Sequence, residues 1–335
     1  MNMNINKIRF IGRHIIKNNK PYFSYSGCGF IFNIKPTSSP YSFTLSLDSE
    51  LREHDTQYIA IYINDKFHSK EKLLSGNNKI TISLDKKQKE VEIRVIKVNE
   101  TYVSSIYLDD IILNNASLIT VKPSNKPLIG FFGDSLTCGF GLLDYQKPEF
   151  SMEGEDFTKD YAYLTCSKLN MDYTVIARSG ISVAIKIYVD LLFKEIYDTV
   201  DMYDKCEVEK NLDYAVINLG TNDNGAYYAV VKEEDQEKAK QSFFDEYLNL
   251  IKTIIKDNPH VKLILCHSMV HNDDTIIKPI EKVKEYIDTH YSNKCSILVF
   301  KPNGDGGAGH PYYPAHEENA KLLVDAINKL EKNSF

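Results

Sequence analysis

The sequence predicts a two-domain chain of the mixed α/β class, with an antiparallel β-sandwich followed by a parallel sheet flanked by helices. Three observations lead to this prediction. The chain has 335 residues, more than the roughly 100–200 that one hydrophobic core ordinarily serves. Its apolar residues alternate with polar ones up to about residue 115, and afterwards short apolar runs alternate with longer amphipathic stretches. We therefore place the domains at residues 1–122 and 123–335.

The first domain is predicted from a period of two in its apolar residues. Apolar and polar side chains alternate in 41–47 (YSFTLSL) and in 80–84 (ITISL), as they do in strands with one buried face. Similar runs at 58–63, 91–98 and 106–113 are separated by turn-like segments such as SGNN and DKKQ. Because no stretch of helical periodicity interrupts these runs, the pattern favours an antiparallel sandwich.

The second domain is expected to begin after a linker that runs from Pro123 to Pro127. Apolar runs typical of buried parallel strands lie at 127–132, 173–177, 214–219, 261–266 and 297–300. Amphipathic helices are expected at 161–169, 181–196, 237–256, 276–289 and 315–330. This alternation predicts a doubly wound domain, and such domains bind their ligands beyond the carboxyl ends of the strands.

Charge and hydropathy limit the partners that the chain is expected to have. The net charge is −6, and Lys and Arg are scattered singly, which argues against binding to nucleic acid or to an anionic membrane. No apolar run approaches the ~20 residues that span a bilayer, and the first 20 residues lack the apolar core of a secretory signal. As written, the chain is expected in the cytoplasm, or outside the cell if a leader has been removed.

The six cysteines stand singly, with no CxxC pair and no Cys/His pair at metal-ligand spacing. They predict reduced thiols and no metal centre. The chain has no Trp but 22 Tyr and 16 Phe, so tyrosine and phenylalanine would have to supply any face on which a sugar stacks.

A serine follows the first predicted strand of the second domain. The run 128–132 continues into GDSLTCG, which places Ser135 after a buried strand and at the start of a helix. The hydroxyl is exposed there, and the helix N-terminus favours a developing negative charge. In a plainer interpretation, Asp134 or Ser135 only caps that helix.

Two further strands end in polar motifs at the same edge of the predicted sheet. The run 214–219 continues into GTND, and the side chain of Asn222 could donate a hydrogen bond to an oxyanion. The alternative is that Asn222 and Asp223 belong to a simple turn. The strand at 173–177 leads to Gly180, where a backbone N–H can approach a substrate oxygen closely.

A glycine-rich segment, GDGGAGHP, carries His310 just before the last predicted helix. A histidine in such a loop is well placed to act as a general base near neutral pH. The chain has nine histidines, and a single histidine in a loop is more often an ordinary surface residue. The assignment of His310 as a base therefore depends on the order of all four motifs.

In this order, GDSLTCGFG, SG, GTND and GHP resemble the blocks of the SGNH (GDSL) hydrolase superfamily, over roughly residues 127–335. The resemblance implies a flavodoxin-like α/β/α domain that hydrolyses esters without metal or organic cofactor. It implies Ser135 as nucleophile and His310 as base. It also implies an oxyanion hole made by the backbone N–H groups of Ser135 and Gly180 and the side chain of Asn222.

Nearly the whole chain resembles carbohydrate esterase family two, which joins a jelly-roll-like sandwich to such a hydrolase domain. The shared features are Gly12-Arg13, the YSG segment at 25–27, INLGTND at 217–223, and the histidines His310 and His316 in HPYYPAH. Members of that family are acetyl esterases of plant polysaccharides. The resemblance therefore implies an acetylated oligo- or polysaccharide as substrate, and it leaves the oligomeric state open.

Two positions depart from the family pattern. An Asp commonly lies two residues before the catalytic histidine and a Trp one before it, but this chain has Ala308 and Gly309 there. The histidine could instead be oriented by the backbone carbonyl of Ala308, as in members that use a Ser–His pair, or by Asp305. Without the Trp, contacts to substrate would come from other side chains, for which the candidates are Asp223, Tyr312 and Tyr313.

Two alternatives to a carbohydrate acetyl esterase remain at this stage. The first is an esterase or thioesterase of the same superfamily that acts on lipid or other small acyl esters, although no extended apolar lid or basic patch is visible. The second is a carbohydrate-binding protein whose hydrolase domain is catalytically dead, an alternative that the altered residues before His310 keep open.

Overall fold

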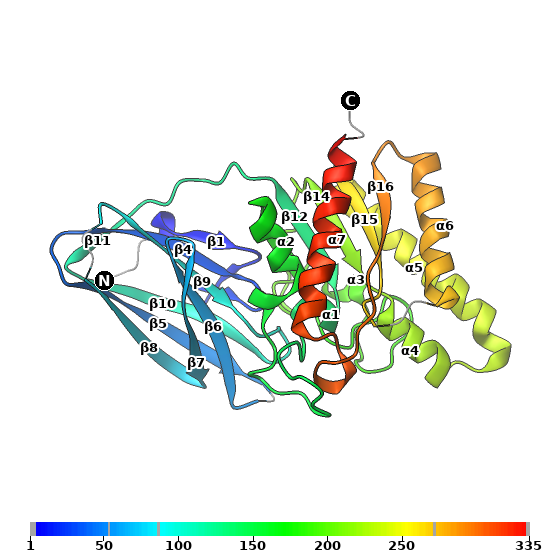
Figure 1. Ribbon diagram of the computed structural model, residues 1–335, viewed down its shortest axis with the longest axis horizontal. Coiled ribbons are helices and arrows are strands. Elements are labelled where there is room, and N and C mark those ends of the chain that lie inside the picture. The colour runs from blue at the N-terminus through cyan, green and yellow to red at the C-terminus, as the bar shows by residue number, and fades with distance from the viewer. Residues whose placement is uncertain (1–4, 53, 86–87, 271–272, 333–335) are drawn as a thin grey trace. The chain divides into compact units, whose positions relative to one another are not determined.

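The computed structural model describes residues 5–52, 54–85, 88–270 and 273–332. The chain divides into two compact units, Met1–Asn125 and Lys126–Phe335. The first unit is built of β-strands, and the second alternates strands with helices (Figure 1). None of the described helices is long and apolar enough to cross a lipid bilayer.

The first unit contains two antiparallel sheets, which confirms the predicted sandwich. One sheet has the order β1 (Arg9–Ile11), β4 (Gly29–Pro36), β9 (Val91–Lys97), β6 (Thr56–Ile63) and β7 (Lys66–Leu74), with β11 (Ala116–Ile119) also paired to β4. The other has the order β2 (Ile15–Lys17), β3 (Lys20–Phe23), β10 (Ser104–Asn114), β5 (Tyr41–Leu51) and β8 (Gly76–Leu84). A short 3-10 turn, Ile5–Lys7, precedes them.

The core of the first unit lies between the inward faces of these sheets. Burial alternates along β5 as the period-two pattern predicts. Phe32 of β4 meets Phe43 of β5 edge to face, with ring centroids 5.5 Å apart, and both side chains are fully buried. Aromatic contacts between strands of different sheets thus join the two layers.

The second unit is a five-stranded parallel sheet, which confirms the doubly wound prediction. Its order is β13 (Asp172–Ala177), β12 (Leu128–Gly133), β14 (Tyr214–Asn218), β15 (Lys262–His267) and β16 (Cys295–Val299). The chain passes from β12 to β13 on one side of it and then returns to β14 on the other side. The loops that follow β12 and β14 therefore diverge at the carboxyl edge of the sheet. That divergence is where doubly wound proteins place their ligand sites.

Four of the described helices flank this sheet. They are α2 (Tyr161–Leu169), α5 (Gln236–Asp257), α6 (Asp274–His290) and α7 (Tyr313–Lys332). Figure 1 shows α2 beside α7 and α5 beside α6, and residues of each pair are in contact. The other described helices are α1 (Ser135–Cys138), α3 (Phe193–Ile196) and α4 (Thr221–Ala229), with 3-10 turns at Phe157–Lys159, Glu233–Asp235 and Gly307–Gly309.

The helix expected at 181–196 is wrong, because only its last four residues, α3, are helical. Residues 181–192 form a loop instead, closed by a bridge between Ser182 and Leu192. The cause lies outside the segment. The buried carboxylate of Asp223 accepts hydrogen bonds from the amides of three successive loop residues, Val183 (2.8 Å), Ala184 (2.7 Å) and Ile185 (3.0 Å).

These bonds satisfy three successive backbone donors of the loop, which therefore need no helical partners. Burial raises the pKa of the Asp223 carboxyl to about 6, and the three amides oppose that rise. Asp223 itself lies in α4, which starts at Thr221. The alternative that Asn222 and Asp223 form a simple turn is therefore wrong as well.

Candidate active site

The segment that carries Ser135 is a tight turn from β12 into α1. Asp134 caps the helix, and its carboxylate accepts a hydrogen bond from the amide of Leu136 at 3.0 Å. The turn requires a glycine at 133, because a Cβ there would lie 2.1 Å from Oγ1 of Thr137. Ser135 is thereby held at the carboxyl edge of the sheet, largely buried, with its hydroxyl oxygen facing the chain's last loop.

Ser135 and His310 meet at hydrogen-bond distance. Oγ of Ser135 lies 2.9 Å from Nε2 of His310, although the two residues are 175 positions apart in the chain. The other ring nitrogen, Nδ1, lies 3.4 Å from the carbonyl oxygen of Ala308, which is a long and weak hydrogen bond. Ala308 has φ 51°, in the left-handed region that a residue with a Cβ seldom adopts, and this conformation turns its carbonyl toward the imidazole.

Asp305, the competing candidate for orienting the imidazole, is directed elsewhere. Its carboxylate is exposed and accepts a hydrogen bond from Nδ2 of Asn303 at 2.8 Å. Its backbone carbonyl accepts from the amide of Gln146 at 2.6 Å, which fastens the loop to the segment after α1. Of the two orienting groups that the sequence offers, the geometry favours the Ala308 carbonyl.

The imidazole of His310 is in a poorly solvated environment. Burial lowers its pKa to about 4, while the backbone hydrogen bonds of Ala308 and Gly307 act in the opposite direction. The ring of Phe140 packs against it, with centroids 4.5 Å apart, and Phe150 stacks on Phe140 at 4.2 Å. His310 is therefore neutral at pH 7, which is the form that can accept the Ser135 proton.

Asn222 and Gly180 lie beside the serine. The Asn222 amide donates to the carbonyl of Ile181 at 2.8 Å, and its Nδ2 lies 3.4 Å from the carboxylate of Asp134. Gly180 has φ 78° and immediately precedes Ile181. The Asn222 side chain thus sits between the residue before Ser135 and the residue after Gly180, so the three segments expected to form an oxyanion hole are neighbours.

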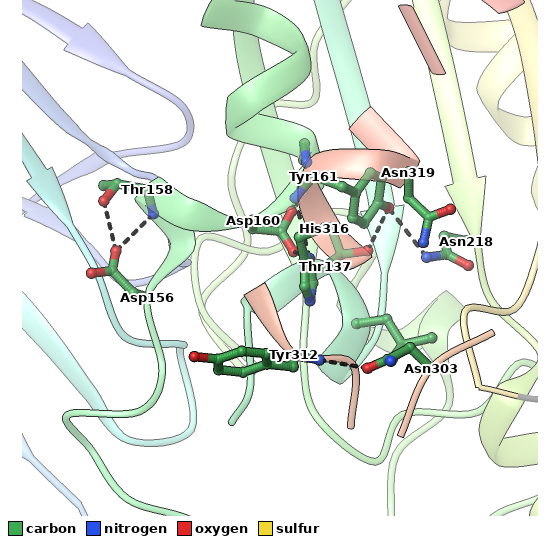
Figure 2. Close-up of polar contacts among 12 residues, drawn as sticks. Thr137, Asp156, Thr158, Asp160, Tyr161, Asn218, Asn303, Tyr312, His316 and Asn319 are labelled. Atoms are coloured by element: carbon green, nitrogen blue, oxygen red, sulfur yellow. Dashed lines mark hydrogen bonds and ion pairs between the residues drawn. The ribbon is translucent and has the colours of Figure 1, made fainter. Parts of the chain in front are cut away.

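The three side chains expected to contact substrate have different surroundings. Asp223 is fully buried beneath the 181–192 loop and positions that loop, so its expected contact with substrate is wrong. The hydroxyl of Tyr313 donates to Glu317 along α7 at 3.0 Å. Tyr312 is half-buried two residues after His310, and its amide is held by Oδ1 of Asn303 at 2.9 Å (Figure 2).

Sequence reasoning missed two exposed tyrosines that flank this site. Tyr145 is 55% exposed, and its ring centroid lies 4.9 Å from that of Tyr312. Tyr188 is 65% exposed and lies against Gly180, because a Cβ on that glycine would come within 2.9 Å of the tyrosine Cβ. Tyr188 was not identified from the sequence because a helix was expected at 181–196. The loop that carries Tyr188 instead depends on hydrogen bonds to Asp223, which is distant in the sequence.

The comparisons with known proteins agree with this geometry. A family model described as the GDSL-like Lipase/Acylhydrolase family matches residues 131–334. A family two carbohydrate esterase from Clostridium thermocellum, solved in complex with cellohexaose, is 19% identical, with a TM-score of 0.85 over 97% of this chain and 99% of that chain.

Two further solved structures are similar over most of their length. An acetyl xylan esterase from the rumen bacterium Butyrivibrio proteoclasticus is 19% identical, with a TM-score of 0.83 over 98% of each chain. A family 2 carbohydrate esterase from Corynascus thermopiles (Myceliophthora fergusii) is 22% identical, with a TM-score of 0.80 over 96% of this chain and 98% of that chain. No curated protein matches the chain. At these identities the structural matches establish a shared fold.

The lowered pKa of His310 predicts the acid limit of activity. A general base must be unprotonated, so kcat/KM for p-nitrophenyl acetate should stay level from about pH 8 to about pH 5 and halve near the pKa of about 4. A stopped assay at each pH measures the profile, and circular dichroism at the same pH checks that the protein is folded. A midpoint near 6.5 would show that the imidazole is solvated.

The position of Asp305 predicts a small effect of its removal. Asp305→Asn should lower kcat by less than about tenfold, whereas a true third member of a triad would lose about 10⁴-fold through the wrong tautomer. His310→Ala should abolish measurable turnover. Steady-state kinetics of both variants make the comparison, and a large loss in Asp305→Asn with the fold intact would assign the orienting role to that carboxylate.

Proposed function

Because the chain belongs to the GDSL-like lipase/acylhydrolase family, we propose that it removes O-acetyl groups from carbohydrate through an acyl-enzyme on Ser135. Membership of that family makes the chain a carboxylic ester hydrolase. The observation that carries the finer proposal is the 2.9 Å contact between Ser135 and His310, set in a chain whose fold is that of family two carbohydrate esterases. The same contact argues against a catalytically dead protein.

The reaction uses the groups already described. His310 takes the proton of Ser135 through Nε2, and Oγ attacks the ester carbonyl. The negative charge on the carbonyl oxygen is met by the amides of Ser135 and Gly180 and by Nδ2 of Asn222. The oxyanion then collapses, the bond between the carbonyl carbon and the sugar oxygen breaks, and the protonated His310 gives its proton to that oxygen. A water molecule, deprotonated by the same imidazole, attacks the acyl-enzyme; the bond to Oγ of Ser135 breaks, acetate leaves, and Oγ takes the proton back.

The hydrogen bond from Asn222 to Ile181 supports its part in this scheme. One hydrogen of the amide is held by the Ile181 carbonyl at 2.8 Å, which fixes the plane of the amide group. The second hydrogen faces only the long 3.4 Å contact with Asp134 and is the one that can turn to an oxyanion. A donor fixed before the reaction is more effective than one that must reorient during it.

Aromatic side chains beside the dyad support a carbohydrate as the acyl carrier. Sugar rings bind to exposed aromatic faces, and Tyr145 forms such a pair with Tyr312, which follows His310 by two residues in the chain. The segment that carries Tyr145 is tied to the His310 loop by hydrogen bonds from Gly307 to Gly141 (2.8 Å) and from Ala308 to Lys147 (3.0 Å). Tyr145 is therefore exposed but held on a fixed backbone. The similarity to a structure described as an acetyl xylan esterase supports acetyl as the acyl group.

Acetate release from sugars tests the proposal. Incubation with acetylated xylo-, manno- and chito-oligosaccharides should remove acetyl groups, seen by mass spectrometry as loss of acetyl mass, and Ser135→Ala should slow this by several orders of magnitude. Acetyl esters should react far faster than octanoyl esters. Equal or faster octanoyl hydrolysis would identify a lipid esterase, and a Ser135→Ala variant with a tenth of the activity would remove this serine from the mechanism.

The tyrosine pair predicts a loss that depends on the substrate. Tyr145→Ala should lower kcat/KM on acetylated oligosaccharide about tenfold, because one stacking contact contributes roughly 0.5–1.5 kcal/mol. The same variant should leave p-nitrophenyl acetate within about twofold of wild type. Tyr203→Ala is the matched control, since Tyr203 is a tyrosine of similar exposure, 68%, in the turn after Asp201. Equal losses on both substrates would exclude a role for Tyr145 in binding sugar.

A further inference from the structure

A second histidine–carboxylate pair lies behind the dyad. Nδ1 of His316 is 3.0 Å from Oδ2 of Asp160, and the two side chains are 1% and 0% exposed. His316 lies in the first turns of α7, six residues after His310, and Asp160 caps the start of α2. Such a pair is costly to bury, so it is retained where it specifies an arrangement that apolar side chains would leave loose.

Asp160 uses its two oxygens for two different helices. Oδ1 accepts the amide of Ala162 at 2.7 Å and so caps α2, while Oδ2 faces His316 of α7. Nε2 of His316 has no hydrogen-bond partner among the described residues. The polar contacts of His316 therefore go to the start of α2. There Nδ1 lies beside Oδ2 of Asp160 and accepts a hydrogen bond from the Tyr161 amide at 3.3 Å.

Tyr161, the next residue, extends these contacts to the other two catalytic segments. Its fully buried hydroxyl lies 2.9 Å from Oγ1 of Thr137, in α1 two residues after Ser135. The same hydroxyl accepts from Nδ2 of Asn218 at 3.3 Å, in the last residue of β14, four residues before Asn222. Figure 2 shows Asp160, Tyr161 and His316 side by side, with Thr137 and Asn218 reached by the tyrosine hydroxyl.

Residues 160 and 161 thus contact the segments that carry the nucleophile, the amide donor and the base. Asn319, three residues after His316 in α7, bonds to both backbone groups of Lys301. Its Oδ1 accepts a hydrogen bond from the Lys301 amide at 2.9 Å, and its Nδ2 donates to the Lys301 carbonyl at 3.2 Å. The chain that leads from β16 into the His310 loop is therefore tied to α7. The loop is anchored before and after the catalytic histidine.

We propose that Asp160, Tyr161 and His316 are positioning residues that set His310 against Ser135. The imidazole of His310 has only a 3.4 Å carbonyl contact at Nδ1, too weak to fix the ring as a carboxylate would. Its place therefore depends on the backbone of its loop, and that backbone continues into α7, which the His316–Asp160 pair fastens. This inference rests on the proposed Ser135–His310 mechanism.

The pair also affects the charge around His310. Among the described residues, the groups that face the His310 ring are the hydroxyl of Ser135, the carbonyls of Gly307 and Ala308, the ring of Phe140 and, from α7, His316. His316 acts electrostatically to lower the pKa of His310. Removing the imidazole should therefore raise the pKa of His310 and move the acid limit of kcat/KM upward in pH.

Three substitutions separate positioning from folding, with p-nitrophenyl acetate as the substrate so that sugar contacts play no part. His316→Ala should lower kcat about 10²-fold with little change in KM, since a misplacement of about 1 Å can cost this much. His316→Asn keeps a polar amide group near the place of Nδ1, within reach of Asp160 and of the Tyr161 amide, and should recover most of kcat, while its acid limit lies higher than that of wild type. Tyr161→Phe should lower kcat about tenfold, because it keeps the ring and removes the link to Thr137 and Asn218.

His290→Ala is the matched control, because His290 is an exposed histidine at the end of α6, and it should behave as wild type. Urea unfolding of every variant measures the folded fraction. If His316→Ala fails to fold, Tyr161→Phe and His316→Asn carry the test. Losses of kcat that only match the unfolded fraction, or a His316→Asn variant as slow as His316→Ala, would overturn the proposal. Activity that persists in Ser135→Ala would instead overturn the mechanism on which it rests.

Discussion

The 2.9 Å contact between Ser135 and His310 is the constraint on which the rest of the second unit depends. One partner follows the first strand of the sheet and the other precedes the last helix, so the contact forms only when the whole unit is folded. The parallel sheet supplies the common edge, because the carboxyl ends of β12 and β14 deliver Ser135 and Asn222 side by side. The glycine-rich loop then has to bring the histidine across that edge.

Buried aspartates hold the loops that this edge needs. Asp134 caps α1 behind the serine, Asp160 caps α2 and holds His316, and Asp223 gathers three amides of the 181–192 loop. Each carboxylate replaces hydrogen bonds that a regular helix or strand would otherwise supply. The site is therefore made of irregular backbone that buried carboxylates hold in place, while tyrosines such as Tyr188 and Tyr145 remain exposed.

Much of the fold could be predicted from the sequence, because the two periodicities are local properties of the chain. The helix at 161–169 and the strand ends that carry Ser135 and Asn222 agree with the structure for this reason. The segment 181–196 does not, since its apolar residues have helical spacing but three of its amides donate to Asp223, 38 to 40 positions away. The sequence pattern of the segment alone cannot reveal hydrogen bonds to a residue so far away in the chain.

By itself the sequence predicted the two fold types, because these follow from the periodicity of apolar residues, and the resemblance of its motifs to a known family implied that Ser135 and His310 would meet. Only the tertiary structure decided what surrounds them. It turned Asp305 toward Asn303 and placed the Ala308 carbonyl at the imidazole, because a left-handed residue within a glycine-rich loop leaves no pattern in the sequence. It likewise joined Asp160 to His316 across 156 positions, since a buried pair forms between helices whose packing is decided by the whole core.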